Sequence, residues 1–151
     1  MSLLEIVLRL GVATVLGAII GLNRDLHGKP TGMRTLGLVA LGAALVVVAV
    51  AELERASDIS PLSRVVQGVL TGIGFLGAGV ILHDATHQNR VYGLTTAAVT
   101  WLTACIGLVC GSGNWRLLAV ALVLLFALLI IGGPVERMLH IRWGGDQPPP
   151  P

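Results

Sequence analysis

The sequence predicts an all-α, polytopic membrane protein built as a bundle of five transmembrane helices. Of its 151 residues, 54% are hydrophobic and 12% are charged, whereas a soluble domain carries about 25% charged residues. The mean hydropathy is +0.85, and a single soluble core of this size could not bury that much apolar surface. The apolar residues also gather into five runs, and 16 of the 18 charged residues lie outside them.

The five runs divide the chain in order. Each is close to the roughly 20 residues that a helix needs to cross about 30 Å of hydrocarbon, and none alternates as a membrane barrel strand does. In hydrocarbon a helix satisfies its own backbone polar groups. We therefore expect a membrane domain over residues 1–135 and a short Pro-rich tail over 136–151. The predicted spans are about 3–22, 35–51, 65–82, 94–110 and 117–133.

The first span and the loop after it carry unusual polar residues. Glu5 and Arg9 are four apart inside the span, so we expect them to form an intrahelical pair. Three interpretations of the loop stay open: positive-inside anchoring, a structural polar network, and a site for an anion or lipid headgroup. The candidate functional polar cluster comprises Asn23, Arg24, Asp25, Lys29, Arg34 and Thr35.

The third span is rich in glycine. Three of its glycines match Gly-x-Gly-x-x-Gly, but the motif lies inside an apolar span and not in a soluble βαβ unit, which excludes a dinucleotide site. Glycines four apart favour close helix packing, and a broken helix lining a polar cavity is the alternative. The candidate packing or pathway glycines are Gly68, Gly72, Gly74, Gly77 and Gly79.

The fourth span carries a row of threonines. Thr96, Thr100 and Thr103 lie on one helix face, and their hydroxyls are expected to bond to carbonyls of their own helix, with bonds between helices or a solvated pore wall as alternatives. Thr95, Thr96 and Thr100 join the packing or pathway candidates. Trp101 lies in mid-span, so we expect it to be a packing anchor.

The reactive and metal-binding side chains of the sequence form no catalytic pattern, so we predict a protein that is not an enzyme and needs no cofactor. No nucleophile–base pair or phosphate-binding loop is present, and the scattered basic residues give no support for nucleic-acid binding. Cys105 and Cys110 would point about 140° apart on a helix and cannot bridge. His83, Asp84 and His87 have metal-ligand spacing in a hydrophilic loop, and we predict no metal site there.

The same segments resemble the MgtC/SapB family of bacterial inner-membrane proteins. The segments that carry the resemblance are Gly21–Asp25, His27–Thr35, Gly72–Ile81 and Gly93–Ala98, together with Trp101. The resemblance implies a five-helix membrane domain with a cytoplasmic C-terminus and a role in adaptation to low magnesium and intracellular survival. It also implies, for some members, inhibition of the F-type ATP synthase through its membrane sector.

Two departures from the family pattern matter. MgtC-type members continue into an ACT-like domain, which is absent here, so the chain is either a short SapB-like member or truncated. The segment Asp84–Arg90 matches poorly, so partner contacts cannot be carried over to it.

Two functions stay open. The first is a regulator for magnesium homeostasis that binds another membrane protein; the second is a transporter or channel for Mg²⁺, phosphate or H⁺. The expected surroundings are the lipid bilayer, a membrane-protein partner and a second copy of the chain.

We predict that the N-terminus lies outside and the C-terminus in the cytoplasm. Six Lys and Arg residues flank the spans on the side of the loop 23–34, against four on the other side, and the richer side stays inside. In a cysteine-free variant, a reporter cysteine at Thr31 should resist an impermeant thiol reagent in whole cells and react after permeabilisation. Labelling in intact cells would reverse the orientation.

Overall fold

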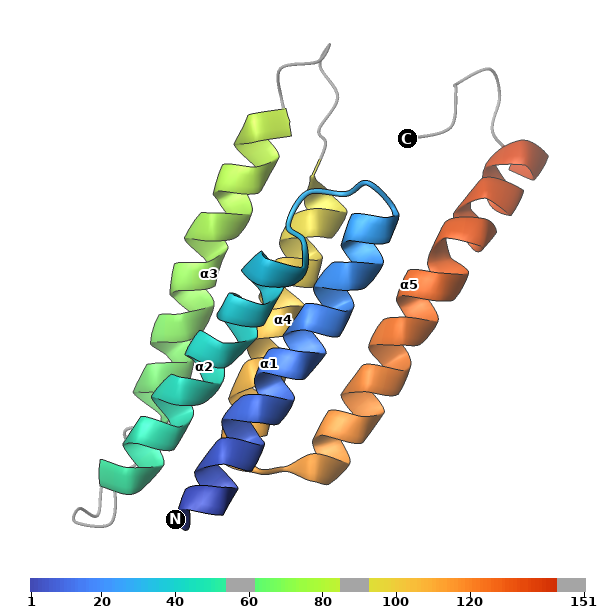
Figure 1. Cartoon of the computed structure of the whole chain (residues 1–151). Helices are drawn as coiled ribbons and strands as arrows, with labels where there is room; N and C mark the ends of the chain where they lie inside the picture. Colours follow the sequence, from blue (N-terminus) through green and yellow to red (C-terminus); the bar gives the residue numbers. More distant parts are fainter. Residues whose placement is uncertain (54–61, 85–92, 144–151) are drawn as a thin grey trace. The chain divides into compact units, whose positions relative to one another are not determined.

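A computed structural model of the chain describes residues 1–53, 62–84 and 93–143. Within them the protein forms five α-helices and no strand, which confirms the all-α prediction (Figure 1). All five are long and apolar enough to cross a membrane. Their bounds are Leu3–Leu26 for α1, Met33–Leu53 for α2, Leu62–Asp84 for α3, Leu94–Ser112 for α4 and Trp115–Trp143 for α5.

The chain divides into two compact units, Met1–Trp115 and Arg116–Pro151. The first unit contains α1 to α4. The second contains nearly all of α5, a 29-residue helix that continues through Pro134 beyond the apolar run predicted for it. Membrane helices tolerate an internal proline because neighbouring groups satisfy the carbonyl it frees.

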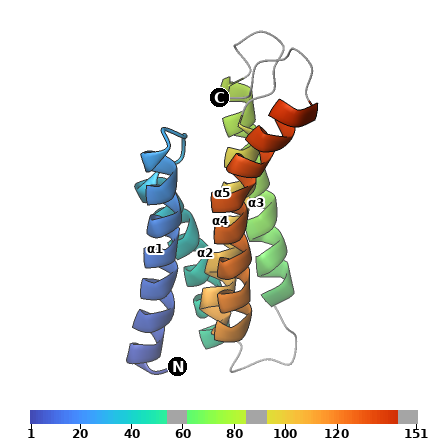
Figure 2. The same cartoon turned by 90° about the vertical axis from the view of Figure 1, so that its right-hand side faces the viewer.

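In the first unit, α2 and α4 form the centre. Successive helices α1 to α4 run in alternating directions, so α2 and α4 are parallel and α1 and α3 oppose them (Figures 1 and 2). In the apolar 18-residue stretch of each helix, the share of residues that is buried is 56% for α4 and 44% for α2. It is only 17% for α1 and 6% for α3. The inner face of α3 meets a small core of Ala43, Val47, Ala104 and Leu108.

Glycines on α1 let that helix approach α2 closely. A Cβ added to Gly17 would lie 2.8 Å from the Cβ of Ala40, and one added to Gly21 would lie 2.5 Å from the Cα of Met33. These distances are shorter than real Cβ contacts, so both positions require glycine. The four-residue spacing of Gly17 and Gly21 is the small-residue pattern of close membrane-helix packing.

The other side of α2 meets a second glycine pair, on α4. A Cβ on Gly107 would lie 2.9 Å from the Cβ of Ala43, and one on Gly111 would lie 2.7 Å from the carbonyl oxygen of Ala44. Small residues therefore set the separation of the three helices α1, α2 and α4. Sequence reasoning missed both pairs, although each has the same four-residue spacing as Gly68 and Gly72.

The predicted glycines of α3 have different surroundings. Gly77 is buried, and a Cβ there would lie 3.4 Å from the Cβ of Ala97. At the other four, Gly68, Gly72, Gly74 and Gly79, an added Cβ would meet no atom within 4 Å. Among the residues that the structure describes, the closest helix contacts are therefore made by glycines of α1 and α4.

We predict opposite effects for two glycine substitutions. Gly107→Leu should lower the free energy of unfolding by at least about 1–3 kcal/mol, because the side chain would overpack the contact with α2. Gly72→Leu should leave it unchanged or raise it slightly, because leucine favours helix and meets open space. Unfolding of the purified protein in detergent measures both, and equal losses would contradict this assignment of contacts.

Candidate functional site

The two arginines of α1 reach opposite ends of α4. Arg9 donates from Nη1 to the carbonyl oxygen of Gly111, at 2.7 Å, near the C-terminus of α4. It also pairs with Glu5, which confirms the predicted intrahelical pair. The carbonyl end of a helix carries partial negative charge, so a guanidinium is favourable there. Arg9 therefore joins α1 to α4 and has a counter-charge beside it.

Arg24 reaches the N-terminal end of α4. It lies two residues before the end of α1, its side chain is only 5% exposed, and Nη2 donates to the hydroxyl oxygen of Thr96 in the first turn of α4. Its Nε is buried and has no hydrogen-bond partner. In the described part of the chain no carboxylate forms an ion pair with this guanidinium. Arg24 is therefore a buried cation that is only partly satisfied.

The helix end that Arg24 approaches has no side-chain cap. The N-cap residue is Gly93, in the left-handed region with φ of +85°, and it offers no side-chain acceptor. Its carbonyl oxygen accepts from the N–H of Ala97 at 2.8 Å. The N–H groups of the first helical residues, Leu94 to Thr96, have no acceptor within the helix itself.

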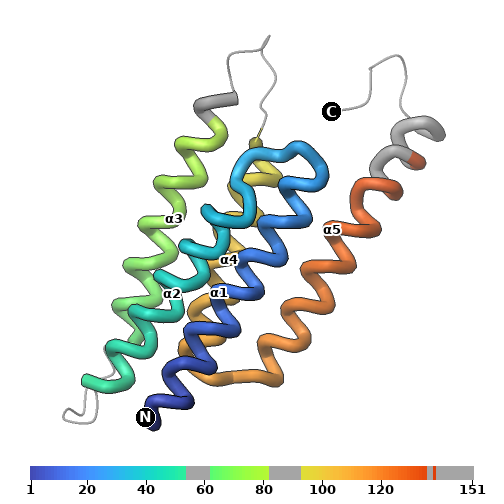
Figure 3. The backbone as a smooth tube through the Cα atoms, in the orientation of Figure 1, coloured from blue at the N-terminus to red at the C-terminus, as the bar shows by residue number. Residues whose placement is uncertain are grey.

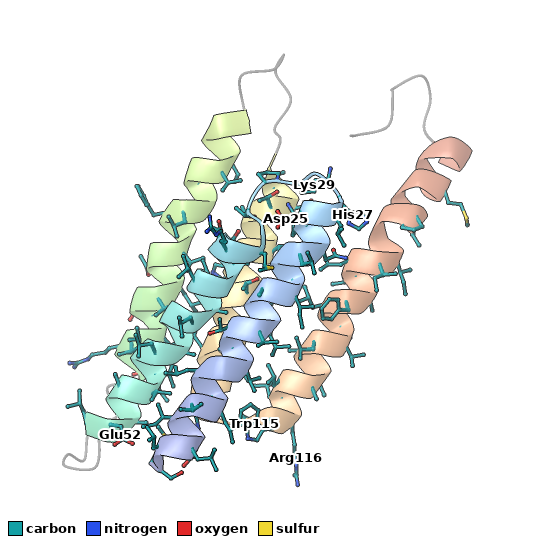
Figure 4. The ribbon with its side chains drawn as sticks, in the orientation of Figure 1. Asp25, His27, Lys29, Glu52, Trp115 and Arg116 are labelled. Carbon is teal, nitrogen blue, oxygen red and sulfur yellow. The ribbon has the colours of Figure 1, made fainter. Side chains whose placement is uncertain are left out.

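Asp25 points to a different helix. Its Oδ2 accepts a hydrogen bond from the N–H of Met33, at 2.9 Å, at the start of α2. A Cβ on Gly32 would overlap the Asp25 carboxylate, so Gly32 leaves the room for this contact. Figure 4 shows Asp25 with His27 and Lys29 at the end of the bundle formed by the α1–α2 loop. Asp25 thus caps α2 and does not pair with Arg24.

The other predicted cluster residues are spread around this end. Arg34 and Thr35 are exposed on the first turn of α2, and Asn23 is half-buried with its carbonyl oxygen 2.7 Å from Nδ1 of His27. The backbone N–H of Lys29 donates to the carbonyl oxygen of Arg24 at 3.1 Å. The structure therefore directs Arg24 to Thr96 and Asp25 to the start of α2, while Arg34 is exposed on the first turn of α2.

The threonines of α4 bond mainly to their own helix. Thr100 donates to the carbonyl oxygen of Thr96 at 2.9 Å and Thr103 to that of Val99 at 2.7 Å, as predicted. Thr96, Thr100 and Thr103 are buried, whereas Thr95 is exposed. Trp101, which we expected to be a packing anchor, is 44% exposed.

An open apolar groove runs between α2 and α3. Its volume is about 530 Å³. The residues that line it are Thr35, Leu38, Val39, Gly42, Ala43, Val46, Val69, Gly72, Ile73 and Leu76. With one hydroxyl side chain among ten, this surface suits an acyl chain or a helix and not a hydrated ion.

The residues that the structure describes form neither a metal site nor a disulfide. No group of three or more metal-ligating side chains occurs among them. The sequence candidate His87 lies outside the described ranges, as do the side chains of His83 and Asp84. Cys105 and Cys110 are free thiols, as their spacing on one helix predicts.

Five helices long and apolar enough to cross a membrane, with close glycine contacts among α1, α2 and α4 and with arginines at both ends of α4, define a polytopic α-helical membrane protein. The sequence profile of the MgtC family matches residues 10–138. The chain belongs to the MgtC family. No solved structure matches it.

Curated relatives agree with this family. Protein SrpB of Synechococcus elongatus is 47% identical over 143 residues, which cover 89% of this chain and 77% of that protein. Protein MgtC of Brucella abortus is 39% identical over 90% of this chain and 56% of its own length. Protein MgtC of Salmonella typhimurium is 37% identical over 91% and 57%. The chain thus spans a little over half the length of these MgtC proteins.

We predict that two Arg→Lys substitutions change the free energy of unfolding by different amounts. Arg24→Lys should lower the free energy of unfolding by about 1–3 kcal/mol, because a lysine cannot reproduce the guanidinium geometry at Thr96 in a buried site. Arg34→Lys should stay within about 0.5 kcal/mol of wild type, because its side chain is exposed. Unfolding in detergent measures both; similar values would show that Arg24 is not specially held.

Proposed function

We propose that this protein is a non-enzymatic regulator in the bacterial inner membrane that supports adaptation to low magnesium by binding another membrane protein. Membership of the MgtC family supports the magnesium role. The membrane sector of the F-type ATP synthase is the first candidate partner, and a second copy of this chain is the next. In this proposal the N-terminus lies outside and the loop 27–32 faces the cytoplasm.

The outer face of α3 is the surface to which we propose that a partner helix binds. Gly68, Gly72, Phe75 and Gly79 follow at helical spacing and so share one face. Phe75 is 80% exposed, and a Cβ at any of the three glycines would meet no atom within 4 Å. The opposite face of α3, with Val66, Leu70 and Ile73, contacts the core.

Glycines with no neighbouring helix lower the stability of a helix that contacts only lipid. Each glycine costs about 1 kcal/mol relative to alanine in a helix interior, and alanine or leucine would face lipid equally well. A closely packed helix offsets this cost through backbone-to-backbone dispersion contacts. The pairs Gly17/Gly21 and Gly107/Gly111 have such a helix beside them in α2. By the same reasoning, Gly68 and Gly72 are suited to a helix of a partner.

The test compares two glycines that both face open space. Gly72→Leu should reduce cross-linked capture of ATP synthase membrane-sector subunits about tenfold or more and abolish growth at low magnesium, because the leucine holds the partner helix away. Gly11→Leu makes the same change on α1, where an added Cβ also meets nothing within 4 Å. It should leave capture and growth at wild-type levels, with both variants equally stable in detergent.

Two results would count against the proposal. Wild-type capture and growth in Gly72→Leu would remove the α3 face as the binding surface, and failure of the wild-type protein to capture those subunits would remove that partner. Flux of Mg²⁺, phosphate or H⁺ into proteoliposomes that contain only this protein would instead support transport.

A further inference from the structure

Among the described residues, the N-terminus of α4 and the side chain of Arg24 bring together more hydrogen-bond donors than acceptors. The first turn of α4 directs N–H groups outward from an N-cap glycine that has no capping side chain. Arg24 is 95% buried, is aimed into this turn through its bond to Thr96, and keeps an unpartnered Nε. These are independent observations, because one concerns the backbone of α4 and the other a side chain of α1.

The charges at this site have the same sign. A helix N-terminus carries roughly half a positive charge, and Arg24 adds a full one. Arg9 provides the comparison within the molecule: it lies 15 residues earlier on α1 and contacts Gly111, 15 residues after Thr96 on α4. There the guanidinium meets the negative helix end and Glu5. Both guanidiniums keep a buried Nε without a partner. Among the residues that the structure describes, Arg9 pairs with a carboxylate and Arg24 does not.

Among the acids whose side chains the structure describes, none pairs with Arg24. The carboxylate nearest in sequence, Asp25, is exposed and accepts from the N–H of Met33 on α2. A buried guanidinium without a counter-charge is strongly destabilising, whereas an anion at a helix N-terminus beside an arginine is favourable. An external anion would satisfy both the first turn of α4 and Arg24.

The position of the site near the helix ends indicates which anions it can meet. Arg24 lies two residues before the end of α1 and Thr96 two residues after the start of α4, about 3 Å inside each helix end. Figure 3 shows the start of α4 and the α1–α2 loop at the same end of the bundle. Because these helices have about the length that is needed to span the hydrocarbon, we expect their ends to lie beside the headgroup region.

We infer that Arg24, Thr96 and the N-terminal N–H groups of α4 bind a phosphate group. The tetrahedral oxygens accept from the guanidinium and from the backbone N–H groups of the first turn. The phosphate belongs either to a phospholipid headgroup or to a free phosphate ion, which share this recognition chemistry. This site is separate from the outer face of α3 and does not depend on the proposed partner.

The experiment uses the full chain, delipidated in a maltoside detergent, and measures its melting temperature. One arm adds inorganic phosphate against chloride at constant ionic strength. The other adds dioleoyl phosphatidylglycerol against dioleoylglycerol, which has the same acyl chains and no phosphate. We expect a rise of about 3–5 °C when the phosphate-bearing probe reaches about ten times its Kd. A rise in the first arm identifies a free ion, and a rise only in the second identifies a lipid headgroup.

Three variants test the residues. Arg24→Gln and Thr96→Val should each weaken binding of the effective probe, by about tenfold or more for Arg24→Gln. Arg34→Gln removes the same charge from an exposed position at the same membrane edge and should keep the wild-type rise. If Arg24→Gln does not fold, the inference is tested by the rise in melting temperature of Thr96→Val and of the wild-type protein with each probe. The inference is overturned if neither probe stabilises the wild-type protein, or if Thr96→Val keeps the full rise, or if Arg34→Gln loses it as fully as the site variants.

Discussion

The close approach of α1 and α4 to α2 is the constraint on which the rest of the first unit depends. Gly17 and Gly21 on one side and Gly107 and Gly111 on the other leave no room for a Cβ against α2. In hydrocarbon there is no hydrophobic force to drive helices together, so dispersion contacts between closely spaced backbones must do so. Removing either glycine pair would therefore change helix separation throughout the unit.

The arginine contacts follow from that separation. A side chain on α1 reaches α4 at both ends because α2 holds the two helices in a fixed relation. Arg9 finds a carbonyl and a carboxylate, and Arg24 finds a hydroxyl and a row of N–H groups. The polar residues of the membrane domain thus act at the helix ends, where headgroups and water are near, while the centre holds threonines bonded to their own helix.

The two proposed activities use different surfaces and different physics. Packing of a partner on α3 would rely on open glycines beside Phe75 and on dispersion, so it would be insensitive to salt. Phosphate binding at Arg24 would rely on a buried positive charge and on helix-end N–H groups.

The sequence by itself determined the solvent, the all-α class and the local pairs. Apolar runs of membrane-spanning length, the Glu5–Arg9 spacing and the threonine back-bonds each depend on one helix alone, so local periodicity was enough. The partner of each helix face was decided only by the tertiary structure. Gly72 and Gly107 have the same kind of spacing in the sequence, yet one meets open space and the other the backbone of α2. Arg24 and Asp25 are adjacent, but a helix turns by about 100° per residue, so one side chain enters the bundle toward Thr96 and the other caps α2. Contacts between helices depend on rotation and separation, which no single span encodes.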